Sequence, residues 1–506
     1  MKAHLMYRDR DFDLQQALPA NEAALRQDLG LDIVFGAMAE GDELLLQAAR
    51  QAVLTGSVND LDTILYRQAI LRDCLQYHGV ARKLYEIAEE AIESKRQHWY
   101  GIFGHYPGGI LHSAVEMLEM LVGFLGKLRR VADDHAGRFN SEGFRALFAT
   151  FKAELDDEYL GTVKGHLREL RFPGGMLASA RLGQGNQGTG YVLRRHSGRR
   201  EGWLRRLLPR RAPGFTFHID PRDEGGARAL SDLQDRSLNE AANLVAQSAD
   251  HALDFFVLLR MELAFYLGCV NLHRRLEGKG VATCFPVPAP AGAGRCSCAG
   301  LRDVALSLKL DGVVVGNDLA ADGKKLVLIT GANQGGKSTF LRSFGQAQLM
   351  MQCGMFVAAD AFHADLCPAL FTHYKREEDT AMASGKFDEE LRRMSEIVDA
   401  LVPDALVLFN ESFAATNERE GSEVARQIVG SLLAGRVRLF YVTHLYDFAR
   451  GFGVEISDET LFLRAERAAD GRRTFKLLPG EPLQTSFGVD VYAGIFDIPS
   501  EKLEPG

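Results

Sequence analysis

The chain has 506 residues, of which 46% are hydrophobic and 25% are charged. This composition predicts a soluble globular protein of about two to four domains and excludes an intrinsically disordered chain. The net charge of −8 gives no global attraction to nucleic acid, so any such contact needs a local basic patch.

The N-terminal residues run directly into charged positions and lack the apolar core of a secretory signal. We therefore expect a cytoplasmic protein. The most apolar helical stretch, 252–270, contains Asp254, Arg260 and Glu262, which favours a buried helix over a membrane span. The seven cysteines form an odd, unpatterned set, which favours reduced thiols over a metal site.

The order of elements predicts a multidomain protein. Residues 1–172 carry apolar side chains every three or four positions, which indicates an all-α core with a first lever helix. Residues 173–229 are rich in glycine and threonine with alternating apolar positions, which indicates a small, β-containing, clamp-like insertion. Helical periodicity returns over residues 230–277. The insertion therefore interrupts a pair of lever-like helices.

Residues 278–300 are rich in proline, glycine, alanine and cysteine and are the expected linker. From 301 to 506, short β-branched runs alternate with helical patterns, as in 326–329, 405–409 and 439–442. This alternation is typical of an α/β domain whose sheet is buried on both faces.

The run Gly331–Ser338 has a glycine, four residues and then Gly-Lys-Ser, between a predicted strand and a predicted helix. In this context backbone N–H groups surround phosphate oxygens, and the positive end of the helix faces the same anion. We expect Lys337 to contact the β and γ phosphates of ATP and Ser338 to ligate Mg²⁺. The expected ATP-binding residues of the loop are Gly331, Asn333, Gly335, Gly336, Lys337, Ser338 and Thr339.

Two later strands also end in polar residues. Strand 405–409 is followed by Asn410 and Glu411, where P-loop ATPases usually place an Asp and a catalytic Glu, so Glu411 is the candidate general base. Strand 440–443 leads to His444, which we expect to face the γ phosphate. Alone, an acid at a strand end is usually solvated and a single histidine is usually structural. The ordered series of loop, acid and histidine favours the catalytic interpretation.

These motifs resemble the ATPase domain of the MutS family of DNA mismatch repair proteins, and the resemblance covers most of the chain. The similar segments are Asp62–Leu75, Val315–Asp318, Thr330–Thr339, Phe356–Ala359, Thr443–His444, Ser486–Val489 and Ala493–Gly494.

The resemblance implies an α/β P-loop ATPase domain of the ABC type that works as a homodimer, in which the partner's signature segment closes over each ATP. Ser384 and Gly385 are the equivalent of that segment here. The resemblance also implies that ATP binding moves levers that clamp double-stranded DNA, mismatched or branched.

The sequence departs from the family pattern at several points. Asn410 stands where the family has an Asp, so Mg²⁺ would be held by Ser338 and a neutral amide, and turnover would be slow. Val314 stands where members often stack an aromatic residue on adenine. Residues 1–60 contain no Phe-x-Glu mismatch-reading motif, and the sequence ends soon after the Ser-Phe-Gly run, which favours a weak or ATP-dependent dimer.

A local basic patch lies between residues 194 and 211, a segment that contains eight arginines and a single acidic residue, Glu201. Such a patch suits the phosphate backbone and confers affinity without reading the base sequence. The alternative is a disordered, solvated loop. The expected DNA-binding residues are Arg194, Arg195, Arg199, Arg200, Arg205 and Arg206.

Two functions fit these features. The first is a MutS-like, ATP-dependent clamp on DNA structures, acting in mismatch repair or in the control of recombination. The second is an ATP-driven conformational switch that binds a protein partner, or branched DNA without mismatch recognition. The acidic overall charge and the absence of a mismatch-reading motif permit the second.

Overall fold

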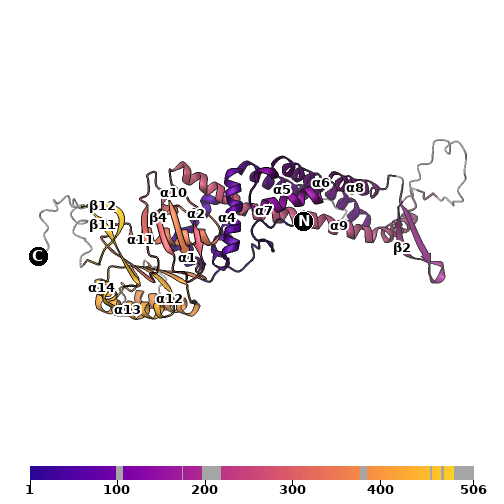
Figure 1. Cartoon of the computed structure of the whole chain (residues 1–506). Coiled ribbons are helices and arrows are strands. Elements are labelled where there is room, and N and C mark those ends of the chain that lie inside the picture. Colours follow the sequence, from indigo (N-terminus) through magenta and orange to yellow (C-terminus); the bar gives the residue numbers. More distant parts are fainter. Residues whose placement is uncertain are drawn as a thin grey trace. The chain divides into compact units, whose positions relative to one another are not determined.

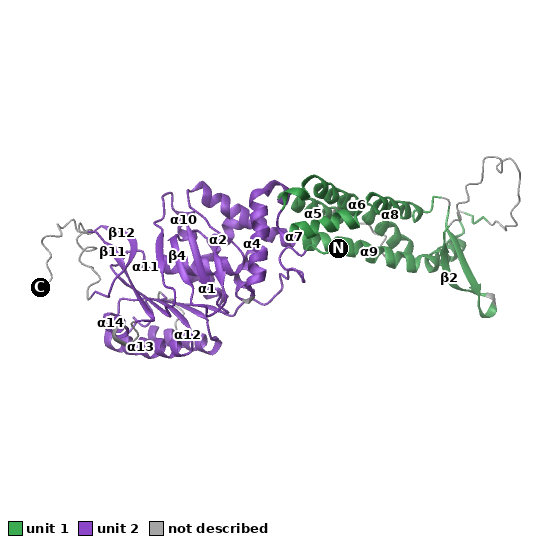
Figure 2. Ribbon diagram, viewed as in Figure 1, with its two compact units in different colours: residues 1–3, 82–139, 144–260 green, residues 4–81, 140–143, 261–506 purple. Residues whose placement is uncertain are grey.

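The structure is a computed structural model of the whole chain. It describes residues 1–98, 106–173, 175–195, 218–220, 222–376, 385–455, 458–468 and 472–483. The chain forms two compact units (Figure 2). The first contains residues 1–3, 82–139 and 144–260, and the second contains residues 4–81, 140–143 and 261–506.

The first unit is mainly helical, as its apolar periodicity predicts. Its core contains a run of phenylalanine rings whose neighbouring centroids lie 4.6–6.4 Å apart. Such tilted and edge-on ring pairs stabilise a core beyond simple burial. The helices with residues in this unit are α5 (His78–His98), α6 (Pro107–His135), α7 (Glu142–Glu154), α8 (Asp157–Glu169) and the 55-residue α9 (Glu224–Gly278).

One helical stretch among the described residues, 107–138, is long and apolar enough to cross a membrane by length and composition alone. It corresponds to α6 with the short turn that follows. Its buried side chains, which include Leu111, Val115, Val122 and Leu125, recur every three or four residues. That spacing is also found in a helix packed on one face in a bundle.

A two-stranded antiparallel hairpin, β1 (Leu177–Leu182) and β2 (Gly188–Arg194), lies between α8 and α9 in the sequence (Figure 1). Neither strand has a buried residue. An isolated two-stranded hairpin is only marginally stable in water. Exposure on both faces therefore marks the hairpin as an extension from the helical unit and not as part of its core.

The second unit combines helices with two sheets. Its helices are α1 (Glu22–Leu29), α2 (Leu31–Ala39), α3 (Glu43–Leu54), α4 (Leu61–Gln76), α10 (Val304–Lys309), α11 (Lys337–Gln352), α12 (Lys386–Ala400), α13 (Glu418–Ala434), α14 (Tyr446–Glu455) and the C-terminal part of α9. The combination of a helical region with an α/β region confirms the coarse fold predicted from the sequence.

A four-stranded sheet has the order β3-β7-β4-β5. Its strands are β3 (Val287–Ala289), β4 (Cys296–Leu301), β5 (Asn317–Ala320) and β7 (Ala361–Asp365). Strand β3 and all of β4 except Leu301 lie within the segment 278–300 that we expected to be a linker. The sequence Cys296–Leu301 forms a strand because its alternate residues, Cys296 and Cys298 among them, are buried. All seven cysteines of the chain are free.

A six-stranded sheet has the order β12-β11-β6-β10-β9-β8. All neighbouring strands are parallel except β11 and β12. Its strands are β6 (Leu326–Gly331), β8 (Leu370–Tyr374), β9 (Leu406–Asn410), β10 (Arg438–Val442), β11 (Thr460–Arg467) and β12 (Arg473–Pro479).

Helices cover both faces of this sheet. The ring of Phe344 on α11 stacks on Phe440 of β10 at 4.2 Å on one face. The helices α12, α13 and α14 lie on the other face (Figure 1). Their side chains share a core with alternate residues of β6, β9 and β10. Because parallel strands end at the same edge, Gly331, Asn410 and Val442 terminate side by side.

Candidate functional site

The glycine-rich loop connects β6 to α11 at this edge. Gly331 and Gly336 have φ angles of 106° and 88°, which L side chains rarely adopt. Gly335 is needed for a different reason, because a Cβ there would lie 2.6 Å from Ala465 Cβ and 2.9 Å from Ala332 O. The loop is therefore a tight turn whose backbone lies directly against β11.

Lys337 is the first residue of α11, and its side chain is only 5% exposed. Its Nζ donates to Gly331 O and to Ala332 O at 3.0 Å each. Burial lowers the pKa of Lys337 to about 8, and the nearby charge of Glu411 acts in the opposite direction. The ammonium is thus held inside the loop and is poorly hydrated, which suits exchange of its carbonyl partners for an anion.

The next residue links the loop to β9. Ser338 Oγ donates to Asn410 Oδ1 at 2.8 Å. Two oxygen atoms at this distance, from a hydroxyl and an amide, can approach one cation together, and hard divalent cations prefer oxygen ligands. The two residues predicted to hold Mg²⁺ therefore lie together, and their donor set fits a magnesium ion.

Glu411 and His444 also lie together. The Oε1 atom of Glu411 is 2.9 Å from His444 Nε2, and this contact lowers the pKa of the Glu411 carboxyl, while its burial raises that pKa. The charge of Lys337 lowers the same pKa further. Glu411 is therefore held as a carboxylate, which is the form a general base requires.

A pocket of about 390 Å³ opens over the loop. Its size is within the range of ligand pockets. It is lined by Leu306, Leu310, Val313, Val314, Val315, Asn317, Asn333, Gln334, Gly335, Gly336, Lys337, Ser338, Thr339, Glu411 and Phe475. The lining therefore combines polar and charged side chains with apolar ones.

Phe475 supplies an aromatic ring that sequence reasoning missed. It lies on β12 and is 47% exposed. Asn317 fixes this position, because its Nδ2 donates to Phe475 O at 3.1 Å and its Oδ1 accepts from Leu477 N at 2.8 Å. Phe475 lines the same pocket as Val314. Phe475 and Val314 are 161 positions apart in the chain, and no pattern of the sequence indicates that pairing.

Arg473 is a second residue that the sequence did not single out. Its Nε donates to Asn333 O at 3.2 Å, and its charge helps to lower the pKa of Lys337. The loop therefore has a guanidinium group on its outer side in addition to the buried ammonium.

Of the remaining predicted residues, those that the structure describes do not line this pocket. Gly385 precedes α12 and does not line it, and Ser384 lies outside the described residues. Arg194 Nε donates to Ser179 Oγ at 2.9 Å, and Arg195 forms an exposed ion pair of 2.6 Å with Glu169. The predicted DNA-binding residues outside the described ones are Arg199, Arg200, Arg205 and Arg206.

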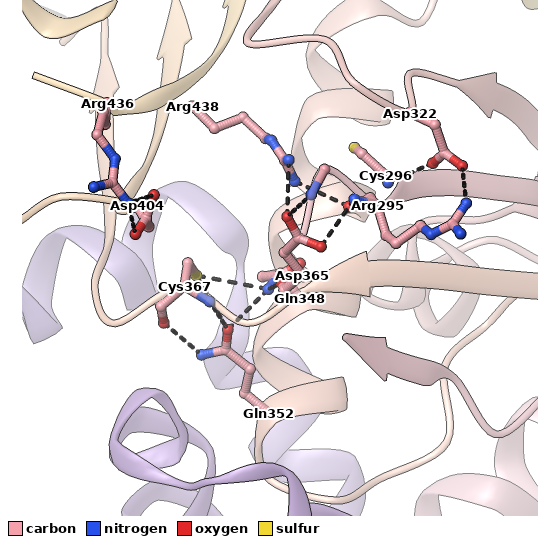
Figure 3. Close-up of polar contacts among 11 residues, drawn as sticks. Arg295, Cys296, Asp322, Gln348, Gln352, Asp365, Cys367, Asp404, Arg436 and Arg438 are labelled. Carbon is pink, nitrogen blue, oxygen red and sulfur yellow. Dashed lines mark hydrogen bonds and ion pairs between the residues drawn. The ribbon is translucent and has the colours of Figure 1, made fainter. Parts of the chain in front are cut away.

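A second, larger pocket of about 500 Å³ lies at the opposite edge of the sheet, where β6, β9 and β10 begin. None of the predicted site residues lines it. Two arginines of its lining form ion pairs (Figure 3), Arg436 with Asp404 at 2.7 Å and Arg438 with Asp365 at 3.0 Å. Lys325, which also lines it, pairs with Glu459 at 2.7 Å. Because these pairs neutralise three of its cations, this pocket is the weaker candidate despite its size.

Two protein-family models match this chain, one in its N-terminal part and one in its C-terminal part. A family described as the MutS2 N-terminal domain matches residues 59–279, and one described as MutS domain V matches residues 327–504. The chain belongs to the MutS family. The family suggested by the sequence motifs is thereby confirmed.

Curated MutS relatives align with about a third of the chain. The DNA mismatch repair protein MutS of Thermus aquaticus is 31% identical over 188 residues, which are 37% of this chain and 23% of that protein. MutS of Porphyromonas gingivalis is 30% identical over 191 residues, 36% of this chain and 21% of that protein. MutS protein homolog 4 of Mus musculus is 24% identical over 183 residues, 35% of this chain and 19% of that protein. The matched region is thus a small part of each relative.

Proposed function

We propose that this MutS-family protein binds and hydrolyses ATP with Mg²⁺ and couples ATP binding to the clamping of DNA, in mismatch repair or in the control of recombination. The observation that carries the proposal is the convergence of three side-chain systems on one pocket. These are the buried Lys337, the Ser338–Asn410 pair and the Glu411–His444 pair.

The lining of the pocket suits the two parts of ATP. The backbone N–H groups of the loop and Lys337 would hold the phosphates, with Arg473 bound to the loop at Asn333 O. The ring of Phe475 and the side chain of Val314 would hold adenine. An exposed ring can stack on any base, so the proposal expects strong phosphate binding and weak selection among bases.

Ser338 and Asn410 would hold Mg²⁺, which would neutralise phosphate charge in the site. Glu411 would accept a proton from the attacking water, since its carboxyl is held ionised beside His444. Asn410 contributes a neutral amide oxygen where a carboxylate would bind the cation more strongly. We therefore expect slow turnover.

The proposal extends to a homodimer and to DNA. Ser384 and Gly385 of one copy would close over the ATP of the other, and two equivalent sites would form about a two-fold axis. The arginines predicted to bind DNA would contact phosphates without reading bases. Two of them, Arg194 and Arg195, lie at the end of the exposed β2 strand and just after it.

Equilibrium binding tests the DNA step. Filter binding would compare homoduplex, mismatched and branched DNA with and without ATP, at more than one salt concentration because phosphate contacts depend on salt. We expect binding that depends on ATP and weakens with salt. A variant with alanine at all six predicted arginines should bind at least about tenfold more weakly, since each phosphate contact adds to affinity. Absence of binding to every DNA, or unchanged binding by that variant, contradicts the DNA clamp and favours a protein partner.

A further inference from the structure

The backbone after β9 is unusual directly beside the proposed catalytic residue. Glu411 has a φ of 55° and Phe413 has a φ of 61°. Both values are left-handed, and neither residue is a glycine or an asparagine, the residue types that adopt this region most readily. Such a conformation persists only where the surroundings impose it, and it is common at functional sites.

The first constraint comes from α12. The backbone N–H of Phe413 donates to Glu390 Oε2 at 2.9 Å in a buried environment. Glu390 is 4% exposed and Phe413 is completely buried. A buried backbone N–H without a hydrogen-bond acceptor is costly. A left-handed residue is not part of a regular strand, so its N–H does not pair with a carbonyl group of a neighbouring strand. The Glu390 carboxyl therefore stabilises the turn by accepting from the backbone N–H of Phe413.

The second constraint comes from β8. The completely buried His373 contacts Glu390 O through Nε2 at 2.9 Å and Ser412 Oγ through Nδ1 at 2.7 Å. Its ring also stacks on Phe413, with centroids 5.3 Å apart. Burial lowers the pKa of His373 to about 4, so the ring is neutral and carries one N–H.

The partners assign that proton. Glu390 O can only accept, so Nε2–H donates to it and Nδ1 accepts from the Ser412 hydroxyl. The backbone oxygen of His373 lies 2.6 Å from the same hydroxyl and competes for its single proton. His373 thus joins α12 to the turn through its two ring nitrogens.

The third constraint comes from β10 and α13. Tyr441 Oη donates to Ser412 O at 2.8 Å. On the other side, Gly421 lies so close to the turn that a Cβ there would be 2.4 Å from Phe413 O. The turn is therefore in contact with α12, β10 and α13 through its backbone and with β8 through the side chains of Ser412 and Phe413. The side chain of Glu411 lines the pocket.

We infer that Glu390 and His373 are positioning residues, which fix the left-handed turn and thereby hold the Glu411 carboxylate at the phosphate loop. The inference rests on the proposed ATPase function. Neither residue lines the pocket, so each acts on the reaction only through the backbone of the turn. A purely structural role would instead lower the stability of the protein and leave the turnover of the folded molecules unchanged.

Two substitutions of Glu390 separate these roles. The Glu390→Gln variant keeps a side-chain oxygen that accepts from Phe413 N, and the Glu390→Met variant keeps the volume but removes the acceptor. We expect Glu390→Met to lower kcat at saturating ATP at least tenfold, with KM and the Kd for ATP changed less than twofold. Glu390→Gln should retain turnover within about threefold of wild type. Glu396→Met, at an exposed position of the same helix, is the matched control and should behave as wild type.

A second pair of variants tests His373 in the same assay. His373→Phe keeps the ring against Phe413 but loses both hydrogen bonds, so kcat should fall while ATP binding persists. Wild-type kcat in Glu390→Met and His373→Phe, measured on folded protein, overturns the inference. Equal losses in kcat and in ATP affinity also overturn it, because they indicate general damage to the site.

A crystal structure of Glu390→Met provides a readout that needs no activity. We expect Phe413 to leave the left-handed region and Glu411 to lose its contact with His444. If both features persist, the inference is wrong. If the wild-type protein binds ATP without turning it over, the hydrolysis part of the proposed function fails, and the crystal structure alone decides the role of Glu390.

Discussion

Two loops at the same edge of the six-stranded sheet form left-handed backbone by different means. The loop after β6 uses Gly331 and Gly336, and between them the exposed Gln334 is also left-handed, with a φ of 60°. The loop after β9 uses Glu411 and Phe413. Glycine adopts this region without steric cost, whereas each non-glycine residue there costs about 1–3 kcal/mol.

The difference lies in where the conformation is encoded. The backbone conformation of the first loop follows from the glycines in its own sequence, and Lys337 donates to carbonyl groups of the same loop. The second is stabilised by hydrogen bonds from side chains of other elements, each worth about 0.5–1.5 kcal/mol for neutral partners and more for charged ones. Changes within the first loop should therefore act on ligand binding. Changes around the second should act on the position of Glu411.

The largest effect should come from Lys337→Met. The substitution removes the ammonium that the loop encloses, so the affinity for ATP should fall more than about a hundredfold, roughly 2.7 kcal/mol. Isothermal titration calorimetry at fixed Mg²⁺ measures this directly. Binding within a few fold of wild type contradicts the assignment of this loop to phosphate.

The same variant should stabilise the nucleotide-free protein. The pKa of Lys337 falls from 10.5 to about 8 on folding, so the folded protein binds this proton more weakly than the unfolded chain. The cost is fully present below pH 8, amounts to at most about 3 kcal/mol, and disappears as pH rises through the window between the two values. Denaturant unfolding at pH 7 and pH 9.5 checks this prediction. The free energy of unfolding of the wild-type protein should gain from the rise in pH, and this gain should be smaller in the variant.

The second effect concerns close contacts of the first loop. Gly335→Ala places a Cβ 2.6 Å from Ala465 Cβ and 2.9 Å from Ala332 O, so the loop must shift. We expect a stability loss of about 1–3 kcal/mol and a loss of ATP affinity of about tenfold or more. Gly430→Ala on α13, where a Cβ meets nothing within 4 Å, is the control and should be neutral or stabilising. Similar behaviour of the two variants contradicts the geometry.

The comparison explains which parts of the site could be predicted from the sequence. The phosphate-loop motif, the acid after β9 and the histidine after β10 follow from short motifs in a fixed order, and parallel strands bring them to one edge. Glu390, His373 and Phe475 could not be predicted in this way. Their roles arise from contacts between elements that are distant in sequence, and neither spacing nor periodicity encodes such contacts.

The fold shows the same division. Long runs with helical or strand periodicity predicted the helical and α/β regions. The segment 278–300 was expected to be a linker because proline and glycine interrupt its pattern, yet β3 and β4 form there. Their pairing with β7 and β5 supplies hydrogen bonds that the local sequence does not reveal.

The third effect concerns the second loop. Gly421→Ala would place a Cβ 2.4 Å from Phe413 O, and α13 or the turn must move. Movement of the turn displaces Glu411, so we expect kcat to fall about tenfold, roughly 1.4 kcal/mol in the barrier. The Kd for ATP should change less than twofold, because Phe413 does not line the pocket. Gly430→Ala on the same helix is again the control. Loss of ATP binding in Gly421→Ala would show that the two loops are not independent.

The smallest effect should come from Asn410→Asp, which lies where the two loops meet. The new carboxylate would stand beside Ser338 Oγ, now 2.8 Å from the amide oxygen, and would bind a hard divalent cation more strongly. The Mg²⁺ concentration for half-maximal turnover should fall several-fold and kcat should rise.

Asn417→Asp is the matched control for Asn410→Asp. It makes the same chemical change at the N-cap of α13, where Asp and Asn cap equally well, so the Mg²⁺ dependence should not change. If Asn410→Asp leaves both the Mg²⁺ dependence and kcat unchanged while ATP still binds, the cation is not held between Ser338 and β9. Slow turnover would then have to be explained by the position of Glu411, which the contacts of the second loop control.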